Sequence, residues 1–372
     1  MASGMDEIRR LCGDPQVARL VETFRAQVGS SGRAHHRKLL KAMRAASAAP
    51  LTEPMQELAL TLKGKLGCRA PKPRGVKAPR AESFAYLPGC LTTESAREYD
   101  ASIRLVAKAL GLALDEIDDW NCCGAGIVQQ ADAQAAAALA RRNVERAGAK
   151  RMLVSGCPIC IARTQEAAPE TPATHLLGIL TRPDVLAKLA EKVKATGQKR
   201  PVGSLKVAPF YGCALADRAL WTIPSPPRGE GVPAPIETLM EAAGATALNW
   251  GGLKRCCGGY LLYARPDLGF EMLEKVFRDF EKSGADAIVT ACPHCHFNLD
   301  AFQFAIGRAR KRALDVPILH FTEVLALAMN LDAERGFERH VTSAFPLVER
   351  LVNEESKRQA AEARAAKKKA RP

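Results

Sequence analysis

The chain has 372 residues, of which 47% are hydrophobic, and this is enough for two ordinary domains with their own cores. The net charge of +14 does not indicate nucleic-acid binding, because aromatic residues make up only 5% and no zinc-finger, RNP-like or helix-turn-helix pattern occurs. Charges interrupt every apolar run before the ~18 residues of a membrane span, and the first residues lack a signal-peptide core. We therefore expect a cytoplasmic protein with no nucleic-acid partner and no direct membrane span.

Cysteine content is the most informative feature of the composition. The chain has twelve cysteines. In the cytoplasm thiols are kept reduced, so these residues indicate metal binding or redox chemistry and not a disulfide framework.

Residues 1–80 are predicted to form a helical N-terminal extension followed by a linker. Apolar residues recur at helical spacing in 17–24, whereas the proline-rich and basic stretch Ala70–Ala81 cannot hold a regular helix. Cys12 and Cys68 lie in this region, have no counterpart elsewhere and are interpreted as ordinary thiols.

Residues 81–200 are predicted to form a first cysteine-rich domain in which short strands alternate with helices. In chain order we expect strand Ser83–Gly89 ending at Cys90, helix Ala96–Leu112, Ile117–Asn121 leading to Cys122-Cys123-Gly124, a helix from Ala131 to Gly148, and strand Arg151–Ser155 ending at Cys157-Pro158-Ile159-Cys160.

Residues 201–335 are predicted to form a second domain with the same order of elements. We expect strand Leu205–Tyr211 ending at Cys213, helix Ile236–Ala242, strand Ala247–Trp250 leading to Cys256-Cys257-Gly258, helix Asp267–Lys282 stopped by Gly284, and strand Ala287–Thr290 ending at Cys292-Pro293-His294-Cys295. An extra loop is expected at Ile223–Pro235, and residues 336–372 are expected to form a helical basic tail.

The spacing of the motifs indicates an internal duplication. Cys122 and Cys256 are 134 positions apart, and Cys157 and Cys292 are 135 apart. Alternating strands and helices favour an α/β fold of two pseudo-symmetric lobes with parallel sheets. The cysteine groups of each lobe then follow the carboxyl ends of strands, so we expect them to converge on one site.

Each half supplies five cysteines, which exceeds the four ligands of a structural zinc site. A Cys-x-x-Cys pair alone also fits a thioredoxin-like dithiol, so zinc and a metal-free redox site remain alternatives. Adjacent cysteines do not easily pair with each other but can bind different irons, and the following glycine permits close backbone approach. Soft thiolate ligands in this number favour iron–sulfur clusters.

With these motifs, both halves resemble the cysteine-rich CCG domain that occurs twice in the B-type subunit of heterodisulfide reductase, with the bacterial sulfur-oxidising type as the preferred setting. The resemblance implies two noncubane 4Fe-4S clusters, which would be the catalytic centres. It implies that a disulfide enters between them, each takes one sulfur, and single electrons split the bond. The implied ligands are Cys90, Cys122, Cys123, Cys157 and Cys160 for one cluster, and Cys213, Cys256, Cys257, Cys292 and Cys295 for the other.

The resemblance implies an oxidoreductase acting on sulfur groups, the catalytic subunit of a heterodisulfide reductase-like complex in sulfur metabolism. Its substrate would be a disulfide, a thiol or a lipoyl protein, and its partners a ferredoxin-like iron–sulfur subunit and a flavin-containing subunit. The alternative is an electron-transfer subunit of a respiratory dehydrogenase for lactate, glycolate, glycerol 3-phosphate or succinate, since these also carry CCG domains.

Several other residues are weaker candidates. Lys254 and Arg255 can steer an anionic substrate, although exposed basic pairs are usually only solvated. His294 and His296 can relay protons, although helix-surface or packing roles are more common. His175 and His320 occupy similar places in the two halves, for which we predict buried structural hydrogen bonds.

Overall fold

The computed structural model describes residues 83–148, 151–196, 202–216, 235–311, 313–331 and 334–354. The predicted N-terminal extension and linker with Cys12 and Cys68, most of the extra loop, and the end of the basic tail lie outside these residues. Within the part of the chain that is described, no helix is both long and apolar enough to cross a membrane.

The first half is built on a four-stranded parallel sheet with the order β2-β1-β3-β4. Its strands are β1 (Ser83–Tyr86), β2 (Ala113–Glu116), β3 (Leu153–Ser155) and β4 (Ala173–His175). The helices between and after them are α5 (Cys90–Glu94), α6 (Arg97–Ala109), α7 (Ile127–Ala131), α8 (Ala133–Ala147), α9 (Pro158–Ala167), α10 (Leu176–Leu180) and α11 (Pro183–Ala195).

The second half repeats this plan with the sheet order β6-β5-β7-β8, again parallel throughout. Its strands are β5 (Lys206–Phe210), β6 (Thr246–Ala247), β7 (Ala287–Thr290) and β8 (Ile318–His320). Its helices are α12 (Gly212–Ala216), α13 (Pro235–Ala242), α14 (Leu261–Ala264), α15 (Pro266–Ser283), α16 (Pro293–Ala301), α17 (Gln303–Ala309), α18 (Phe321–Ala328) and α19 (Glu334–Phe337). Residues 345–354 form a further helix. The predicted fold of two related α/β lobes is confirmed.

Local sequence explains most element boundaries. Strands such as β7 are short, apolar and buried at every residue, as expected for parallel strands covered on both faces. Asp132 begins α8 by accepting hydrogen bonds from the main-chain N–H groups of Gln134 and Ala135, so this helix starts two residues after the predicted Ala131. Gly284 ends α15 in the left-handed conformation, with φ of 70°.

Strand β6 is shorter than the predicted Ala247–Trp250. Trp250 is buried, donates its indole N–H to the carbonyl of Pro209 over 2.7 Å and packs against Phe210 and Phe280.

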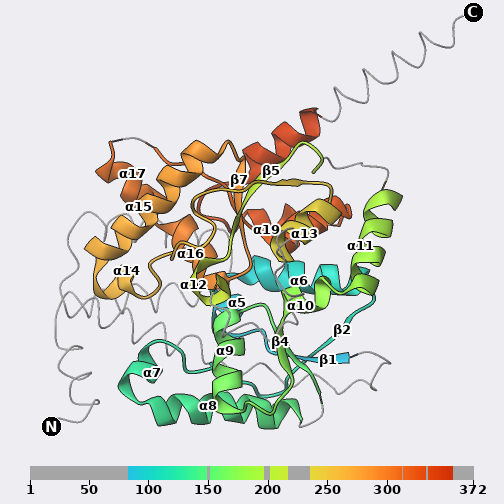
Figure 1. The fold of residues 1–372 in the computed structure, drawn as a ribbon, viewed down its shortest axis with the longest axis vertical. Helices are drawn as coiled ribbons and strands as arrows, with labels where there is room; N and C mark the ends of the chain where they lie inside the picture. The colour runs from blue at the N-terminus through green and yellow to red at the C-terminus, as the bar shows by residue number, and fades with distance from the viewer. Residues whose placement is uncertain are drawn as a thin grey trace, which may run out of the picture.

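The two halves contact each other through paired helices (Figure 1). Helix α6 of the first half packs on α18 of the second, and their repeat equivalents, α13 of the second half and α10 of the first, also pack on each other. The cysteine-bearing helices pair in the same reciprocal way, with α5 against α16 and α12 against α9. One hydrophobic core includes buried residues from both halves, whereas two smaller cores each belong to one half.

The turns before the two Cys-x-x-Cys motifs are joined by shared hydrogen bonds. His175 Nε2 lies 2.8 Å from the carbonyl oxygen of Gly156 and 3.0 Å from that of Ala291. Its Nδ1 accepts the main-chain N–H of Leu177, so Nε2 carries the proton and donates to both carbonyls. The hydroxyl of Tyr99 reaches the same two carbonyls, at 3.1 and 3.3 Å. The predicted structural hydrogen bond of His175 is therefore confirmed.

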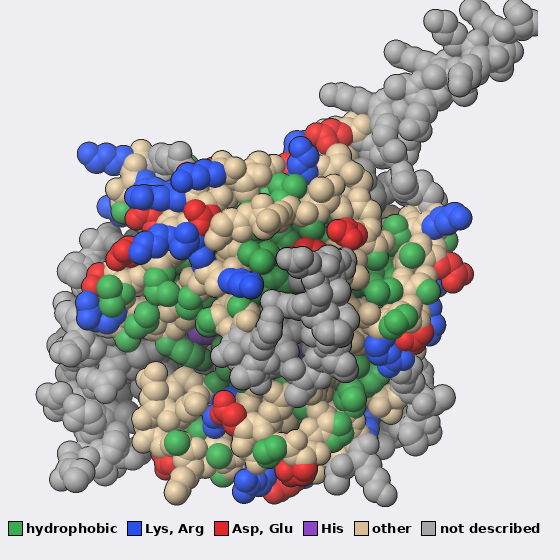
Figure 2. Space-filling model, viewed as in Figure 1, with side chains coloured by type: hydrophobic (Ala, Val, Ile, Leu, Met, Phe, Trp, Pro, Cys, Tyr) green, Lys and Arg blue, Asp and Glu red, His purple; other side chains and the backbone are tan. Residues whose placement is uncertain are grey.

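On the face shown in Figure 2, positive and negative side chains alternate over α15 and α17. Lys275 pairs with Glu271 and Arg278 with Glu274, each at 2.7 Å. The basic side chains of these helices are therefore balanced locally by acidic ones.

The junction formed by His175, Tyr99 and the carbonyls of Gly156 and Ala291 predicts a specific pH dependence of the free energy of unfolding. Burial lowers the pKa of His175 to about 4 from its ordinary 6.5, so the unfolded chain takes up a proton first as the pH falls. The stability contribution of neutral His175 is complete above pH 6.5 and is lost progressively toward pH 4, by roughly 3 kcal/mol at most. Denaturant titrations should show a shallower pH dependence for His175→Gln than for the unmodified protein. The same pH dependence of unfolding free energy in both proteins would contradict the conclusion that His175 is buried in its neutral form.

Candidate functional site

The first set of five cysteines is positioned by three strand ends. Cys90 begins α5 directly after β1, and Cys122 and Cys123 lie in the loop that follows β2. Cys157 precedes the first residue of α9, and Cys160 lies in its first turn, directly after β3. All five line one pocket. The predicted convergence is therefore observed in this half.

The second set has the same placement. Cys213 lies in α12 after β5, and Cys256 and Cys257 lie in the loop after β6. Cys292 precedes α16, and Cys295 lies in its first turn. The Sγ atoms of Cys213 and Cys256 lie 3.8 Å apart, and Cys257, Cys292 and Cys295 pack in one buried cluster, so the three groups of cysteines meet here as well.

The spacing of the sulfur atoms fits tetrahedral metal coordination. The Sγ atoms of Cys90 and Cys122 are 3.6 Å apart, and those of Cys213 and Cys256 are 3.8 Å apart. Two thiolates on one tetrahedral metal with a metal–sulfur distance of ~2.3 Å are separated by about 3.8 Å. All ten described cysteines are free thiols, so none is withdrawn by a disulfide. The donor sets therefore fit thiolate-bound metal.

Burial differs within each set in the same way. Cys123, Cys157 and Cys160 are buried, whereas Cys90 and Cys122 are partly exposed. In the second set Cys257, Cys292 and Cys295 are buried, while Cys256 is partly exposed and Cys213 is exposed. Each set is thus accessible from outside through the cysteine that follows the first strand and the first cysteine of the adjacent pair.

Hydrogen bonds among the thiols favour the thiolate form at particular positions. Hydrogen bonds with Cys123 and Cys90 lower the pKa of Cys122 to about 3. A hydrogen bond from Cys160, assisted by main-chain N–H groups in the first turn of α9, lowers the pKa of Cys157. In the second set, Cys256 and Cys295 lower the pKa of Cys257 well below its ordinary value. The thiolate is the form that binds metal.

In each set, the glycine just before the first cysteine leaves space for the sulfur of the last cysteine. Gly89, with φ of +83°, would place a Cβ atom 3.1 Å from the sulfur of Cys160, and Gly212, with φ of +63°, would place one 2.8 Å from that of Cys295. The glycine of the first Cys-Cys-Gly motif permits close backbone approach, as predicted. A Cβ on Gly124 would lie 2.9 Å from the backbone of Ala136, so this glycine permits contact with α8.

The remaining candidates divide between buried packing and surface ion pairing. His294 and His296 are both buried, so a position on the helix surface is wrong for either residue. His294 packs edge-on against Tyr260, and His296 Nε2 bonds the carbonyl of Ile318 at 3.0 Å. Arg255 is bound to Asp279, which leaves it less available to an anionic substrate.

The ring of His320 is fully buried, as expected, but its role differs from the prediction. Within the part of the chain that the structure describes, neither ring nitrogen has a hydrogen-bond partner. The ring is instead stacked between Tyr99, at 3.9 Å, and His296, at 4.0 Å. The predicted structural hydrogen bond is therefore wrong for the side chain of this histidine.

Two residues near the cysteines were not found from sequence. Tyr260, from the second half, lines the cavity of the first set. Asn298 donates to the carbonyls of Cys257 and Gly259 and lies 3.6 Å from the sulfur of Cys257. No local pattern marks either residue, whereas Gly89 and Gly212 each directly precede the first cysteine of a set and were detectable as a repeat.

Comparison with known proteins agrees with the duplicated site. The family model described as CCG, cysteine-rich domain, matches twice, at residues 84–163 and 207–300. Each of these two segments is thus similar to this cysteine-rich domain. The two matched segments contain all ten cysteines of the two sets.

Two relatives match most of this chain. The 8-methylmenaquinol:fumarate reductase membrane anchor subunit of Wolinella succinogenes is 29% identical over 290 residues, covering 72% of this chain and 99% of the relative. A protein of Archaeoglobus profundus, named as similar to the B-type subunit of heterodisulfide reductase, is 28% identical over 296 residues, covering 71% of this chain and 96% of the relative. These matches and the CCG domains support an iron–sulfur, reductase-like subunit of a multi-subunit complex.

A crystal structure of a hypothetical protein from Helicobacter pylori matches the fold with a TM-score of 0.50 and 10% identity. The match covers 83% of this chain and 61% of that protein. At this identity the similarity concerns the fold alone.

The contact between Gly89 and Cys160 predicts a selective loss of cofactor. Gly89→Ala should lower the iron and sulfide content of the first set, because the new methyl group would lie against the Cys160 sulfur. Gly111→Ala is the matched control, since Gly111 also has a positive φ, of +74°, but nothing within 4 Å of a Cβ atom. Metal analysis of anaerobically purified variants tests this. Equal losses in both would show that backbone strain, and not the sulfur contact, is responsible.

Proposed function

We propose that this protein is the catalytic iron–sulfur subunit of a heterodisulfide reductase-like complex. Its two five-cysteine sets would hold two noncubane 4Fe-4S clusters, and its reaction would make or cleave a disulfide, or act on a lipoyl- or sulfur-bound thiol, in sulfur metabolism. The observation that supports this most directly is the presence of two equivalent five-thiol sites whose Cys-x-x-Cys turns share hydrogen bonds to His175.

The donor set argues against simple zinc sites. Zinc takes four ligands, whereas each set offers five thiols at equivalent places in the fold. When bound, iron–sulfur clusters in these sets would supply or accept single electrons at the sulfur atoms of the substrate.

The residues around the cysteines have separable roles in this proposal. The buried cysteines would anchor the cofactor, and the more accessible Cys90, Cys122, Cys213 and Cys256 would mark the sides from which substrate approaches. Tyr260 would restrict access to the first set, whose cavity it lines. Asn298 would stabilise negative charge on the Cys257 sulfur by its N–H group. The corresponding position in the first half is Arg163, so the two sets would differ electrostatically.

Electrons would arrive through partner subunits. We propose a ferredoxin-like iron–sulfur subunit and a flavin-containing subunit, in a complex located in the cytoplasm. The chain itself has no ferredoxin-like Cys-x-x-Cys-x-x-Cys run and no Gly-x-Gly-x-x-Gly fingerprint after a strand.

A second candidate function is an electron-transfer subunit of a respiratory enzyme. The relative named as a fumarate reductase subunit favours it, because that match covers nearly the whole relative. In this case the sets would pass electrons onward, and a small disulfide or thiol would not bind at them.

The two sets should lose cofactor independently. Cys123→Ala should remove about half of the iron and sulfide from a chain that binds about eight irons, and Cys257→Ala should remove the other half, because each residue is buried in only one set. Cys68→Ala should leave both unchanged. Anaerobic purification followed by iron, sulfide and zinc analysis provides the measurement. Zinc without sulfide in the unmodified protein would overturn the iron–sulfur proposal.

Thiol titration separates the two functions. For a heterodisulfide reductase-like subunit, the electron paramagnetic resonance spectrum should change when a thiol or disulfide is added to the anaerobic protein. An unchanged spectrum at full iron content would favour the respiratory alternative. Tyr260→Phe serves as a comparison, since it keeps the ring in the cavity and removes only the hydroxyl.

A further inference from the structure

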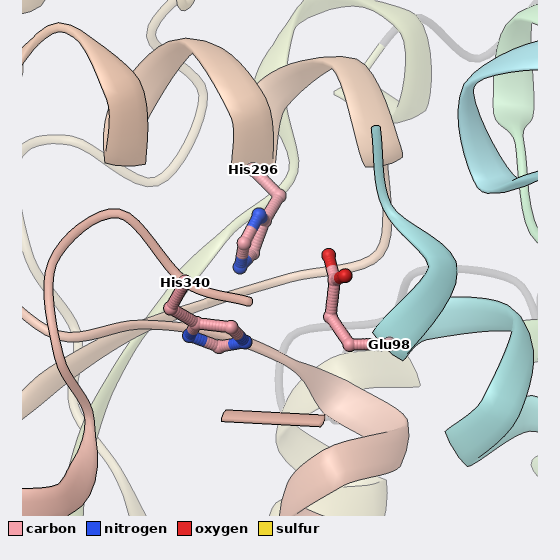
Figure 3. A group of neighbouring side chains, drawn as sticks. All are labelled: Glu98, His296 and His340. Carbon is pink, nitrogen blue, oxygen red and sulfur yellow. The ribbon is translucent and has the colours of Figure 1, made fainter. Parts of the chain in front are cut away.

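A group of buried metal-ligand side chains lies apart from the cysteine sets, where the two halves meet (Figure 3). It consists of Glu98 from α6, His296 from α16 and His340 from the segment after α19. One oxygen or ring nitrogen from each lies within 4.8 Å of the others. The three side chains point toward one another and are at most 5% exposed.

Two further buried residues extend this group. Glu323 Oε1 lies 2.9 Å from His340 Nε2. His320 Nε2 lies 3.8 Å from Glu98 Oε1, and within the described residues neither of its ring nitrogens has a hydrogen-bond partner. A fully buried imidazole directed at a carboxylate, with both nitrogens unsatisfied, is costly unless another partner binds there.

The buried carboxylates of the group also require a balancing positive charge. Asp300 is buried nearby but accepts the main-chain N–H groups of Val341 and Thr342, at 2.6 and 2.8 Å, and so fixes the segment that carries His340. Glu323 accepts the main-chain N–H of His320 through Oε2, at 2.7 Å, while its Oε1 lies beside His340. The negative charge of two buried carboxylates, Glu98 and Glu323, must be balanced by bound protons or by a cation.

We propose that Glu98, His296 and His340 bind one divalent transition-metal ion of the zinc type, with Glu323 as a neighbouring carboxylate donor. Two imidazoles and carboxylate oxygens are suitable ligands for Zn²⁺ and Fe²⁺, in contrast to the all-thiolate sets. Ligands about 2.1 Å from a tetrahedral metal lie about 3.4 Å from each other, so the group must contract by only about 1.4 Å. The ion would join α6 of the first half to α16 of the second.

The test uses the iron-loaded full-length protein, so that the thiols are already occupied. Zinc added after mild chelation should bind with about one equivalent per chain, and X-ray absorption at the zinc edge should show nitrogen and oxygen neighbours without sulfur. Glu98→Gln and His340→Gln should weaken this binding by at least about 100-fold, since even loss of a residue supporting a metal ligand costs ~10–100-fold. Glu94→Gln is the matched control, because Glu94 lies on the preceding helix and is exposed.

Thermal unfolding gives a second readout. Zinc should raise the melting temperature of the unmodified protein and of Glu94→Gln, but not that of Glu98→Gln. Because glutamine is nearly isosteric with glutamate, Glu98→Gln should fold, and its result is decisive even if His340→Gln does not fold. Sulfur neighbours at the zinc edge, or unchanged affinity in Glu98→Gln, would overturn the proposal. Cys123→Ala should retain the zinc site, so failure here and failure of the cluster proposal are distinguishable.

Discussion

The hydrogen bonds that His175 and Tyr99 share between the carbonyls of Gly156 and Ala291 determine how the two sites are placed. Each carbonyl belongs to the residue just before a Cys-x-x-Cys motif, so one imidazole and one phenol fix both motifs at once. Both side chains are almost fully buried, where unsatisfied carbonyls would be costly. The separation of the two cysteine sets is therefore a property of the core and does not depend on surface loops.

This junction also explains why the two halves share a core. Tyr99 stacks on His320 and packs edge-on against Phe321 at the start of α18, and Ser102 bonds Thr322 at 2.7 Å. Helix α6 thus belongs to the first half in sequence but supports the second half in space. The same helix carries Glu98, so the histidine and carboxylate group is buried by the contact that positions the cysteines.

Much of the architecture was predictable because its signals are local. Apolar runs of three to five residues followed by cysteine mark β1, β3, β5 and β7, and the repeat spacing reveals the duplication. The grouping of the cysteines followed from the rule that parallel strands end at one edge of a sheet. Their role as cluster ligands remains a prediction.

The unpredicted features depend on contacts distant in sequence. Tyr99 and Ala291 are 192 positions apart, and nothing near either residue indicates that they meet. The close backbone approach at Gly124 was predicted, but its neighbour, the backbone of Ala136 in α8, was not, because nothing in the local sequence identifies it. His320 has a local sequence similar to that of His175 but a different partner, the ring of Tyr99, and its hydrogen bonding therefore differs.

The crosswise helix contacts have a consequence for how such a protein can diverge. Helix α5 meets α16 as α12 meets α9, and α6 meets α18 as α13 meets α10, which is the reciprocity of a two-fold homodimer joined into one chain. In a homodimer every substitution would occur in both sites. Fusion removes that constraint, and His294 and His296 of the second half correspond in the repeat to Ile159 and Ile161 of the first half. One copy can thus acquire polar, proton-binding chemistry while its twin remains apolar.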